Sequence, residues 1–185
     1  MTRQELLKRS FIFSMNEEGK SVYTNDKRDS GGPTKWGIAL NYNRDIIPDK
    51  DGNGIINAED IKRLTENDAL IVYEERYWKP NIKPEYPDAL AFMLADMCLN
   101  PGPGITPKLL QRALDFTGKD VDGKIGKRTL AAIASADLKE LLPKLADYRF
   151  DYYESRPAFP VYGKGWTART NRCLKEALKI LKETE

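Results

Sequence analysis

Apolar residues recur at the spacing of an α-helix along most of the chain. The first such run predicts a helix from about Gln4 to Glu17, which Gly19 ends. The same spacing predicts further helices at residues 34–46, 58–64, 65–78, 87–99, 107–116, 127–134, 137–154 and 166–182. No long run alternates between apolar and polar residues as a half-buried strand does. The chain is therefore predicted to be mostly α-helical.

Polar and apolar residues also mark where these helices begin and end. Residues 19–33 contain three glycines, a proline and several Asn, Asp and Ser residues, which predicts turns with a short hairpin around Ser21 to Thr24. Thr65 is placed to cap the helix that follows it. The segment 87–99 is so apolar that we expect it to be the central buried helix, and the prolines and glycines after it end it.

Composition indicates a globular protein and excludes several classes of function. The chain has 185 residues, of which 41% are hydrophobic and 31% charged, enough for one domain or one domain with a small satellite. Its formal net charge is only +2, so nothing favours binding to nucleic acid. No stretch approaches the roughly 20 apolar residues of a membrane span, and the charged N-terminus does not resemble a signal peptide. We therefore expect synthesis in the cytoplasm.

The content of histidine and cysteine limits the chemistry further. There is no histidine, which removes the commonest general base, the Ser-His and Cys-His nucleophile systems and most zinc sites. Cys98 and Cys173 stand alone in apolar helical patterns, which predicts reduced core residues. An enzyme built from this chain must work mainly with carboxylates, lysine or tyrosine.

Carboxylates gather where the first predicted helix ends. Glycoside hydrolysis needs one carboxylic acid to protonate the leaving oxygen and a second group to guide the water. Glu18 stands at the helix end, with Glu17 as a competitor for the role of the acid. Asp26 and Asp29 follow across the turns, and the hydroxyl of Thr34 is suited to hold a water. On spacing alone, a solvated acidic turn is the commoner explanation of this pattern.

The run EGKSVYTNDKRDSGGPTKWGI, from Glu18 to Ile38, resembles glycoside hydrolase family 108. That family carries the pattern Glu-Gly-Gly-Tyr-x-Asn-Asp-x-x-Asp-x-Gly-Gly-x-Thr-x-x-Gly-Ile/Val near its N-terminus. Its members are N-acetylmuramidases with a lysozyme-like fold, mostly phage endolysins and prophage proteins. The resemblance implies a lysozyme-like α+β fold with a small hairpin after the first helix. It also implies that Glu18 is the catalytic acid.

The resemblance extends over nearly the whole chain. Residues 105–182 are similar to the C-terminal half of the family, a predicted peptidoglycan-binding region. This implies a catalytic region at residues 1–104 and a helical region at residues 105–185, packed together as one domain. Gln111 falls in the family's order and is assigned to substrate binding. The implied partner is bacterial peptidoglycan, reached in the periplasm or cell wall after release from the cytoplasm.

The sequence departs from the family at the N-terminal end of the run. The second glycine is absent, and Glu18 to Tyr23 spans two residues more than the family's Glu-Gly-Gly-Tyr. Without those two residues, Asp29 and Thr34 stand at the spacing of the Glu, Asp and Thr of phage lysozymes. This analogy implies that Asp29 and Thr34 position the attacking water. Asp26 is the rival for that role and is otherwise assigned to substrate binding.

A second acidic segment, residues 49–60, matches the twelve-residue calcium loop of EF-hand proteins at positions 1, 3, 5, 6 and 9, with Asp60 in place of the usual Glu at position 12. The ligands would be Asp49, Asp51, Asn53, the carbonyl of Ile55, Asn57 and Asp60. Gly54 permits the sharp turn at the sixth position. The alternative is an Asx-rich turn in which Asn57 caps the next helix. The pattern predicts a structural Ca²⁺, while the proposed hydrolysis needs no cofactor.

Three more residues are candidates for contact with sugar. Trp36 and Tyr77 are suited to stack on sugar rings, although large aromatic residues in helical proteins more often lie in the core. Asn100 could hydrogen-bond an acetamido group or cap the helix before it. The resemblance thus implies an N-acetylmuramidase that cleaves the β-1,4 bond after N-acetylmuramic acid. The alternatives are a wall-binding or secretion-associated protein of the same fold with an impaired site, and a calcium-responsive interaction module.

Overall fold

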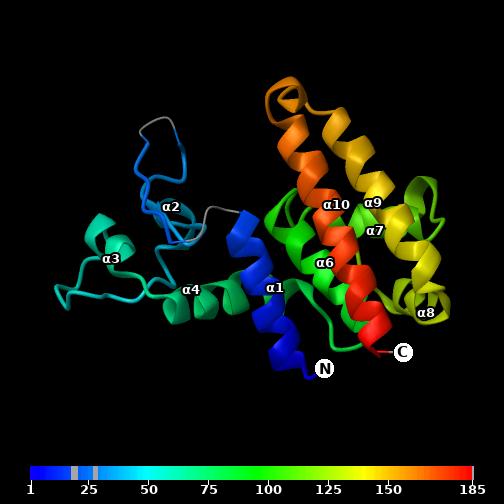
Figure 1. Cartoon of the computed structure of the whole chain (residues 1–185), viewed down its shortest axis with the longest axis horizontal. Helices are drawn as coiled ribbons and strands as arrows, with labels where there is room; N and C mark the ends of the chain where they lie inside the picture. Colours follow the sequence, from blue (N-terminus) through cyan, green and yellow to red (C-terminus); the bar gives the residue numbers. More distant parts are fainter. Residues whose placement is uncertain (18–20, 27–28, 185) are drawn as a thin grey trace. The chain divides into compact units, whose positions relative to one another are not determined.

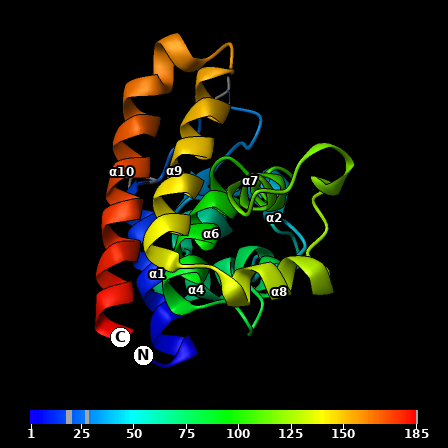
Figure 2. The same ribbon diagram turned by 90° about the vertical axis from the view of Figure 1, so that its right-hand side faces the viewer.

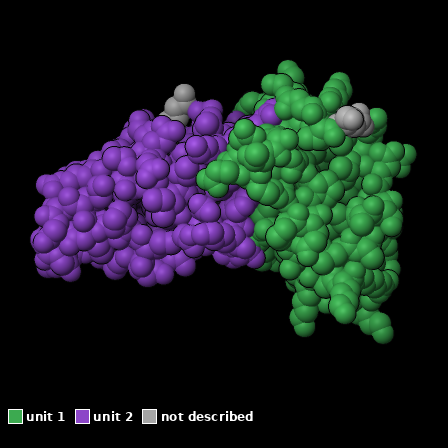
Figure 3. Space-filling model, turned by 90° about the horizontal axis from the view of Figure 1, so that it is seen from below, with its two compact units in different colours: residues 1–6, 81–185 green, residues 7–80 purple. Residues whose placement is uncertain are grey.

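The computed structural model describes residues 1–17, 21–26 and 29–184, and in these ranges helices predominate (Figure 1). The chain forms two compact units, shown in different colours in Figure 3. Unit 1 comprises residues 1–6 and 81–185, and unit 2 comprises residues 7–80. Helix α1, Arg3–Glu17, begins in unit 1 and continues in unit 2, and its bounds confirm the predicted first helix.

Unit 2 combines short helices with a two-stranded hairpin. Its elements after α1 are β1 (Thr34–Lys35), β2 (Ile38–Ala39), α2 (Leu40–Asn43), α3 (Ala58–Arg63), α4 (Glu66–Tyr73), a π-helix (Glu74–Trp78) and α5 (Lys79–Asn81), which crosses the boundary. Buried apolar residues from α1, β2, α3 and α4 form its core, with the rings of Phe11 and Tyr73 edge to face at 5.7 Å. Residues 65–78 were predicted as one helix, and they form α4 followed by the π-helix.

The hairpin confirms the predicted fold class, but its position differs from the prediction. We expected a hairpin around Ser21 to Thr24 and a helix over residues 34–46. Instead β1 and β2 pair antiparallel, with Lys35 opposite Ile38, and only α2 is helical. The two residues of the turn, Trp36 and Gly37, have φ of 55° and 67°. Such φ values are those of a type I′ turn, which matches the twist of a two-residue hairpin.

Capping side chains define the helices of unit 2 as the sequence predicts. The hydroxyl of Thr65 accepts from the backbone N–H of Asp68, and the Asp68 carboxylate accepts from the N–H of Thr65. Asn57 and Asp60 make the same reciprocal pair at the start of α3. Each pair satisfies backbone donors that a helix leaves free at its first turn.

Unit 1 is built around the apolar helix α6 (Asp88–Leu99), in which every residue from 89 to 98 is buried. The helices that follow are α7 (Thr106–Ala113), α8 (Lys127–Ser135), α9 (Leu138–Glu154) and α10 (Phe159–Thr184), with a 3₁₀ turn at Gly118–Asp120. Figures 1 and 2 show α9 and α10 side by side, and both pack on α6. The prediction of a central buried helix is confirmed.

Arg3 ties the N-terminus of the chain to unit 1. Its guanidinium pairs with the carboxylate of Asp88 at 3.1 Å, in the first turn of α6. The same group donates to the backbone carbonyl oxygens of Lys83, Pro84 and Tyr86 at 2.8–2.9 Å. One arginine therefore satisfies several acceptors in the segment that leads into α6.

The last helix begins earlier than its apolar pattern predicts. We expected a start at Trp166, but α10 begins at Phe159. Pro160 lies in its first turn, where a missing N–H costs nothing. Gly163 is buried because the ring of Phe159 lies over it, so close that an added Cβ would meet a ring carbon at 2.7 Å. The proline and glycines between Phe159 and Trp166, which led us to predict a later start, are thus part of α10.

Within the described ranges, no helix is both long and apolar enough to cross a membrane. Along the chain, the boundaries of the two compact units fall between residues 6 and 7 and between residues 80 and 81. The predicted division into a catalytic region at residues 1–104 and a helical region at residues 105–185 stays a prediction.

Candidate functional site

Asp29 is held in a tight turn that leaves its carboxylate at the surface. Its backbone N–H donates to the carbonyl of Asp26 at 3.0 Å, and its own carbonyl accepts from Gly32 at 3.1 Å. Its Oδ1 accepts from the N–H of Gly31 at 2.8 Å. Among the described residues Oδ2 has no partner, so one carboxylate oxygen is oriented by the backbone and the other is available to a water.

The two glycines after Asp29 have different structural roles. Gly31 is buried, and a Cβ added there would lie 2.9 Å from the Cβ of Ala39 and 3.2 Å from Asp29 Oδ1. Gly32 has a φ of +69°, which L side chains rarely adopt. The first glycine thus permits the close approach of the turn to β2, and the second permits the bend.

Thr34 follows this turn at the start of β1. It pairs with Thr24 through two backbone hydrogen bonds of 2.9 Å. Its hydroxyl donates to the carbonyl of Gly32 at 2.9 Å. The hydroxyl proton is therefore engaged, and the lone pairs of Oγ1 remain free to accept a hydrogen bond from water.

The other acids of the predicted site are placed less fully. Asp26 is exposed on the same turn, and its carbonyl oxygen accepts from Asp29. Glu17 is half-buried as the last residue of α1. Glu18, the predicted acid, lies outside the described residues.

The two aromatic candidates are both partly exposed. The indole N–H of Trp36 donates to the carbonyl of Leu64 at 3.3 Å, which fixes the tip of the hairpin. Tyr77 lies in the π-helix with its ring 6.0 Å from that of Tyr73. Trp36 and Tyr77 thus each make a contact within the protein. Stacking of either ring on a sugar stays a prediction.

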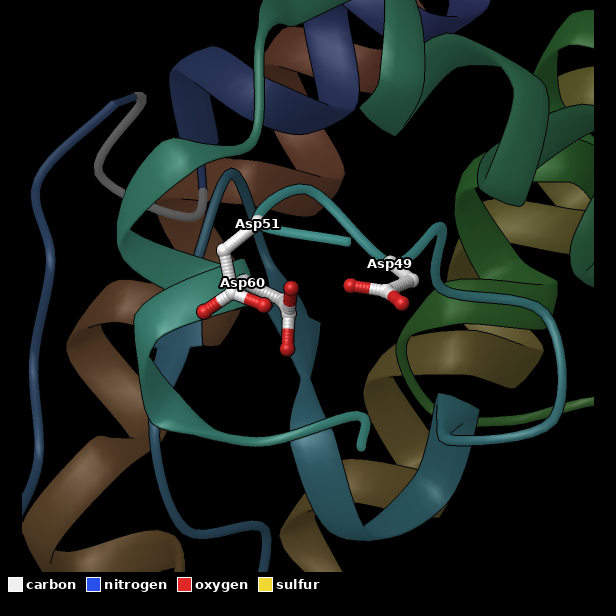
Figure 4. A group of neighbouring side chains, drawn as sticks. All are labelled: Asp49, Asp51 and Asp60. Carbon is white, nitrogen blue, oxygen red and sulfur yellow. The ribbon is translucent and has the colours of Figure 1, made fainter. Parts of the chain in front are cut away.

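The predicted calcium loop brings its acidic residues together, as Figure 4 shows. One carboxylate oxygen each of Asp49, Asp51 and Asp60 lies within 4.8 Å of the others. Oxygen ligands lie about 2.3–2.6 Å from Ca²⁺, so two ligands of one ion are at most roughly 5 Å apart. Gly54, at the sixth position, has a φ of +79°.

Backbone hydrogen bonds favour the ionised form of two of these carboxylates, those of Asp49 and Asp60. Asp49 accepts from the N–H of Gly54 at 2.8 Å, a bond that lowers the pKa of its carboxyl below the ordinary value. The Asp60 carboxyl is buried, yet the N–H of Asn57 at 2.8 Å also lowers its pKa. The loop therefore presents charged oxygens at neutral pH. Of the other expected ligands, Asn53 and Asn57 already accept from backbone N–H groups.

Asn100 is held at the end of α6 by a buried arginine and a tyrosine of α9. Its backbone carbonyl accepts from Arg149 at 2.7 Å, and its side-chain oxygen accepts from the hydroxyl of Tyr153 at 2.7 Å. Its own N–H donates to the carbonyl of Asp96, as expected of a capping position. Only the side-chain NH₂ has no partner among the described residues, and it is the group that would donate to an acetamido oxygen.

Gln111 lies inside unit 1, only 1% exposed. Its NH₂ donates to Asp122 Oδ1 at 2.8 Å and to the carbonyl of Lys124 at 3.1 Å, and its oxygen accepts from the N–H of Gly123 at 2.8 Å. The amide thus fixes the turn after the 3₁₀ helix. The expected contact with substrate stays a prediction.

Sequence reasoning missed Arg149 and Tyr153, which position Asn100. Both lie in the buried face of α9, some fifty residues from Asn100 in the chain. Arg149 also pairs with Asp96 at 2.8 Å, and Asp96 pairs with Arg169 at 2.7 Å. In the sequence, basic residues at these positions are expected to lie on solvated helix faces. The buried cluster that they form with Asp96 is therefore visible only in the fold.

Comparison with known proteins gives two family matches. Residues 11–102 match the model described as glycosyl hydrolase 108, and residues 106–171 match the predicted peptidoglycan domain. The solved structure of Brucella abortus SagA is similar, with a TM-score of 0.76 and 27% identity over 96% of each chain. No curated protein matches. Together these similarities indicate a glycoside hydrolase that acts on peptidoglycan.

Proposed function

Because residues 11–102 belong to the glycosyl hydrolase 108 family, we propose that the protein is an N-acetylmuramidase. It would cleave the β-1,4 bond between N-acetylmuramic acid and N-acetylglucosamine in peptidoglycan. Its site of action would be the periplasm or cell wall, where that substrate lies. The observation that carries the proposal is the matched run from Glu18 to Thr34, in which Asp29 and Thr34 are fixed by the same turn.

In the proposed reaction Glu18 acts as the general acid. It donates its proton to the glycosidic oxygen as the bond to the anomeric carbon breaks. Water attacks that carbon from the opposite face and passes a proton to a carboxylate base. In an inverting enzyme the two carboxyl groups stand about 6.5–9.5 Å apart to leave room for the water.

The described side chains support Asp29 as the base. Its Oδ1 is held by the N–H of Gly31, while Oδ2 is left to accept the proton. The hydroxyl of Thr34 donates to Gly32, so it can only accept from the water and thereby orients it. Asp26 stands on the same turn as the rival base.

The stereochemistry of the product tests this assignment. We expect the new reducing end to appear first as the α-anomer, which ¹H NMR resolves before mutarotation. Asp29→Asn is expected to lower kcat by about 10²–10⁴-fold, the usual contribution of a general base. Asp26→Asn is the matched control, expected to retain activity within about tenfold. An initial β-anomer, or a larger loss in Asp26→Asn than in Asp29→Asn, would contradict the roles proposed here.

We further propose that residues 49–60 hold a structural Ca²⁺. The support is the match to the calcium-loop pattern, three converging carboxylates and the positive φ of Gly54. A ligand that binds only the folded state stabilises it, by about 2.7 kcal/mol at a hundredfold excess over Kd. The melting temperature should therefore rise in millimolar Ca²⁺ relative to chelator. The same rise in Asp49→Asn, or none in the wild type, would exclude the site.

A further inference from the structure

An open groove of about 610 Å³ lies on unit 1, bordered by α7 and α9. Figure 2 shows α7 next to α9. Its lining includes Arg112 at the end of α7, the α9 residues Tyr148, Asp151 and Tyr152, and Arg156 just after α9. All five lie within residues 106–171, the part that matches the predicted peptidoglycan domain.

The α9 side of the groove is one polar and aromatic face of that helix. Tyr148, Asp151 and Tyr152 stand at positions i, i+3 and i+4, which are neighbours on a helix surface. The buried face of α9 instead carries Arg149 and Tyr153, which contact Asn100. The groove residues are exposed or half-exposed, so packing of the core does not account for their character.

Arg156 is held in place with donors to spare. Two of the five N–H donors of its guanidinium bond to Ser155 Oγ, at 3.3 and 3.0 Å. The guanidinium carbon lies 4.6 Å from the centroid of the Tyr152 ring, a cation–π contact. The Ser155 hydroxyl donates to the carbonyl of Tyr152 at 2.7 Å. The remaining guanidinium donors have no acceptor among the described residues.

The groove also carries charges without partners. Among the described residues, the side chains of Arg112 and Asp151 form no ion pair, and both are exposed. The lining thus presents two guanidinium groups and one carboxylate. A guanidinium binds a carboxylate through two parallel hydrogen bonds, a geometry that lysine cannot offer.

We propose that this groove binds the stem peptide of peptidoglycan, with Arg112 and Arg156 pairing with its free carboxylates. Asp151 would accept from the free amino group that the diamino acid of the stem carries before it is crosslinked. The tyrosine rings would cover the apolar parts of the peptide. The inference rests on the proposed action on peptidoglycan, and it assigns a recognition surface outside the hydrolytic site.

The charge pattern favours a peptide over other polymers of the wall. In a peptide-substituted strand the sugars themselves offer no free carboxylate for the two arginines, because the lactyl group of muramic acid is amide-linked wherever a peptide is attached. A polyphosphate chain would match the arginines but would bring its negative charge against Asp151. A stem peptide carries both carboxylates and an amine, and it complements both signs.

The test is direct binding of the tripeptide L-Ala-γ-D-Glu-meso-diaminopimelate to the full chain, measured by isothermal calorimetry at low ionic strength. We expect saturable binding to the wild type that weakens as salt is raised. The double variant Arg112→Gln/Arg156→Gln should bind on the order of tenfold more weakly, because it loses two charge-assisted contacts. Both residues are exposed, and circular dichroism checks that the variant is folded.

A charge-matched control removes two lysines of α10 that lie outside the groove. Lys175→Gln/Lys182→Gln has the same net charge as the arginine variant and should keep the wild-type affinity within about twofold. Equal weakening in both variants would show a diffuse charge effect and overturn the proposal. So would wild type that binds no tripeptide, or that binds a glycerol phosphate polymer instead.

This experiment is separate from any assay of hydrolysis. A wild type that binds the tripeptide but cuts no wall would refute the proposed muramidase activity and leave the groove assignment standing. A wild type that cuts the wall but binds no tripeptide would refute the groove assignment alone.

Discussion

Asp96 pairs with two buried arginines of unit 1, and we predict that Asp96→Asn strongly destabilises the protein. Asp96 is 1% exposed, Arg149 0% and Arg169 4%. Its oxygens lie 2.8 Å from Arg149 and 2.7 Å from Arg169. Removing the charge takes away the carboxylate that these two buried guanidinium groups share.

The structure sets the size of this effect. Removing one partner of a buried ion pair costs about 3–5 kcal/mol, because the remaining charge stays buried without compensation. For a chain of this length 1 kcal/mol corresponds to roughly 2–4 °C, so the melting temperature should fall by about 10 °C. Urea denaturation followed by circular dichroism at pH 7 measures the loss. The control is Asp147→Asn on α9, exposed and expected to change stability by less than about 0.5 kcal/mol.

The pH dependence gives a second measure of the same cluster. Burial alone would raise the pKa of Asp96, but the charges of Arg149 and Arg169 outweigh it and hold the pKa below the ordinary value. A lowered pKa in the folded state gives stability that is present above the pKa of the unfolded chain, about 3.9. That stability is lost as pH falls through the folded pKa. The gap between wild type and Asp96→Asn should therefore be constant near neutrality and narrow below about pH 4. A variant within about 1 kcal/mol of wild type at pH 7 would refute the reasoning.

Three further substitutions test local packing. Gly31→Ala should lower the free energy of unfolding by about 1–3 kcal/mol, because the added methyl group overpacks against Ala39. It should also lower activity by displacing Asp29. The control for the melting temperature is Gly104→Ala, because Gly104 has open space around it. Gln111→Ala should cost a similar 1–3 kcal/mol and speed hydrogen exchange at the Gly123 amide, and unchanged exchange would contradict its role in that turn. Gly163→Ala should lower the melting temperature through the Phe159 ring, and an increase would show that the ring moves freely.

The helices were predictable because their signals are local. The spacing of apolar residues gave α1 and α6 nearly to their ends, and Thr65 marked the start of α4 through its capping box. The convergence of Asp49, Asp51 and Asp60 was predictable for the same reason, since the three residues lie within twelve positions, while the bound Ca²⁺ stays a proposal.

The hairpin and the start of α10 were not predictable from such local signals. Trp36 adopts a positive φ at the first turn position, where Asn, Asp or Gly is usual, so Gly37 at the second position was not enough to indicate a type I′ turn. Gly163 suggests a break in the helix, but it is needed to admit the ring of Phe159. In both places a tertiary contact overrides the intrinsic preference of the residue.

The residues of the candidate site also fall into two groups, those found from local signals and those that only the fold brings together. The turn that carries Asp29 and Thr34 is short, so its residues were found together. The support of Asn100 by Arg149 and Tyr153 joins residues about fifty positions apart, and the groove joins the end of α7 to α9. Such arrangements depend on how helices pack, which the pattern of single residues does not encode.

The most direct test of the central claim is digestion of purified peptidoglycan by wild type, Glu18→Gln and Glu17→Gln, with mass spectrometry of the new reducing ends. The proposal predicts muramic-acid ends from wild type and Glu17→Gln, and none from a folded Glu18→Gln. Activity that persists in Glu18→Gln would contradict the assignment of the acid. A folded wild type that releases nothing from several wall types would contradict the muramidase itself, and would favour a wall-binding protein whose site is altered between Glu18 and Tyr23.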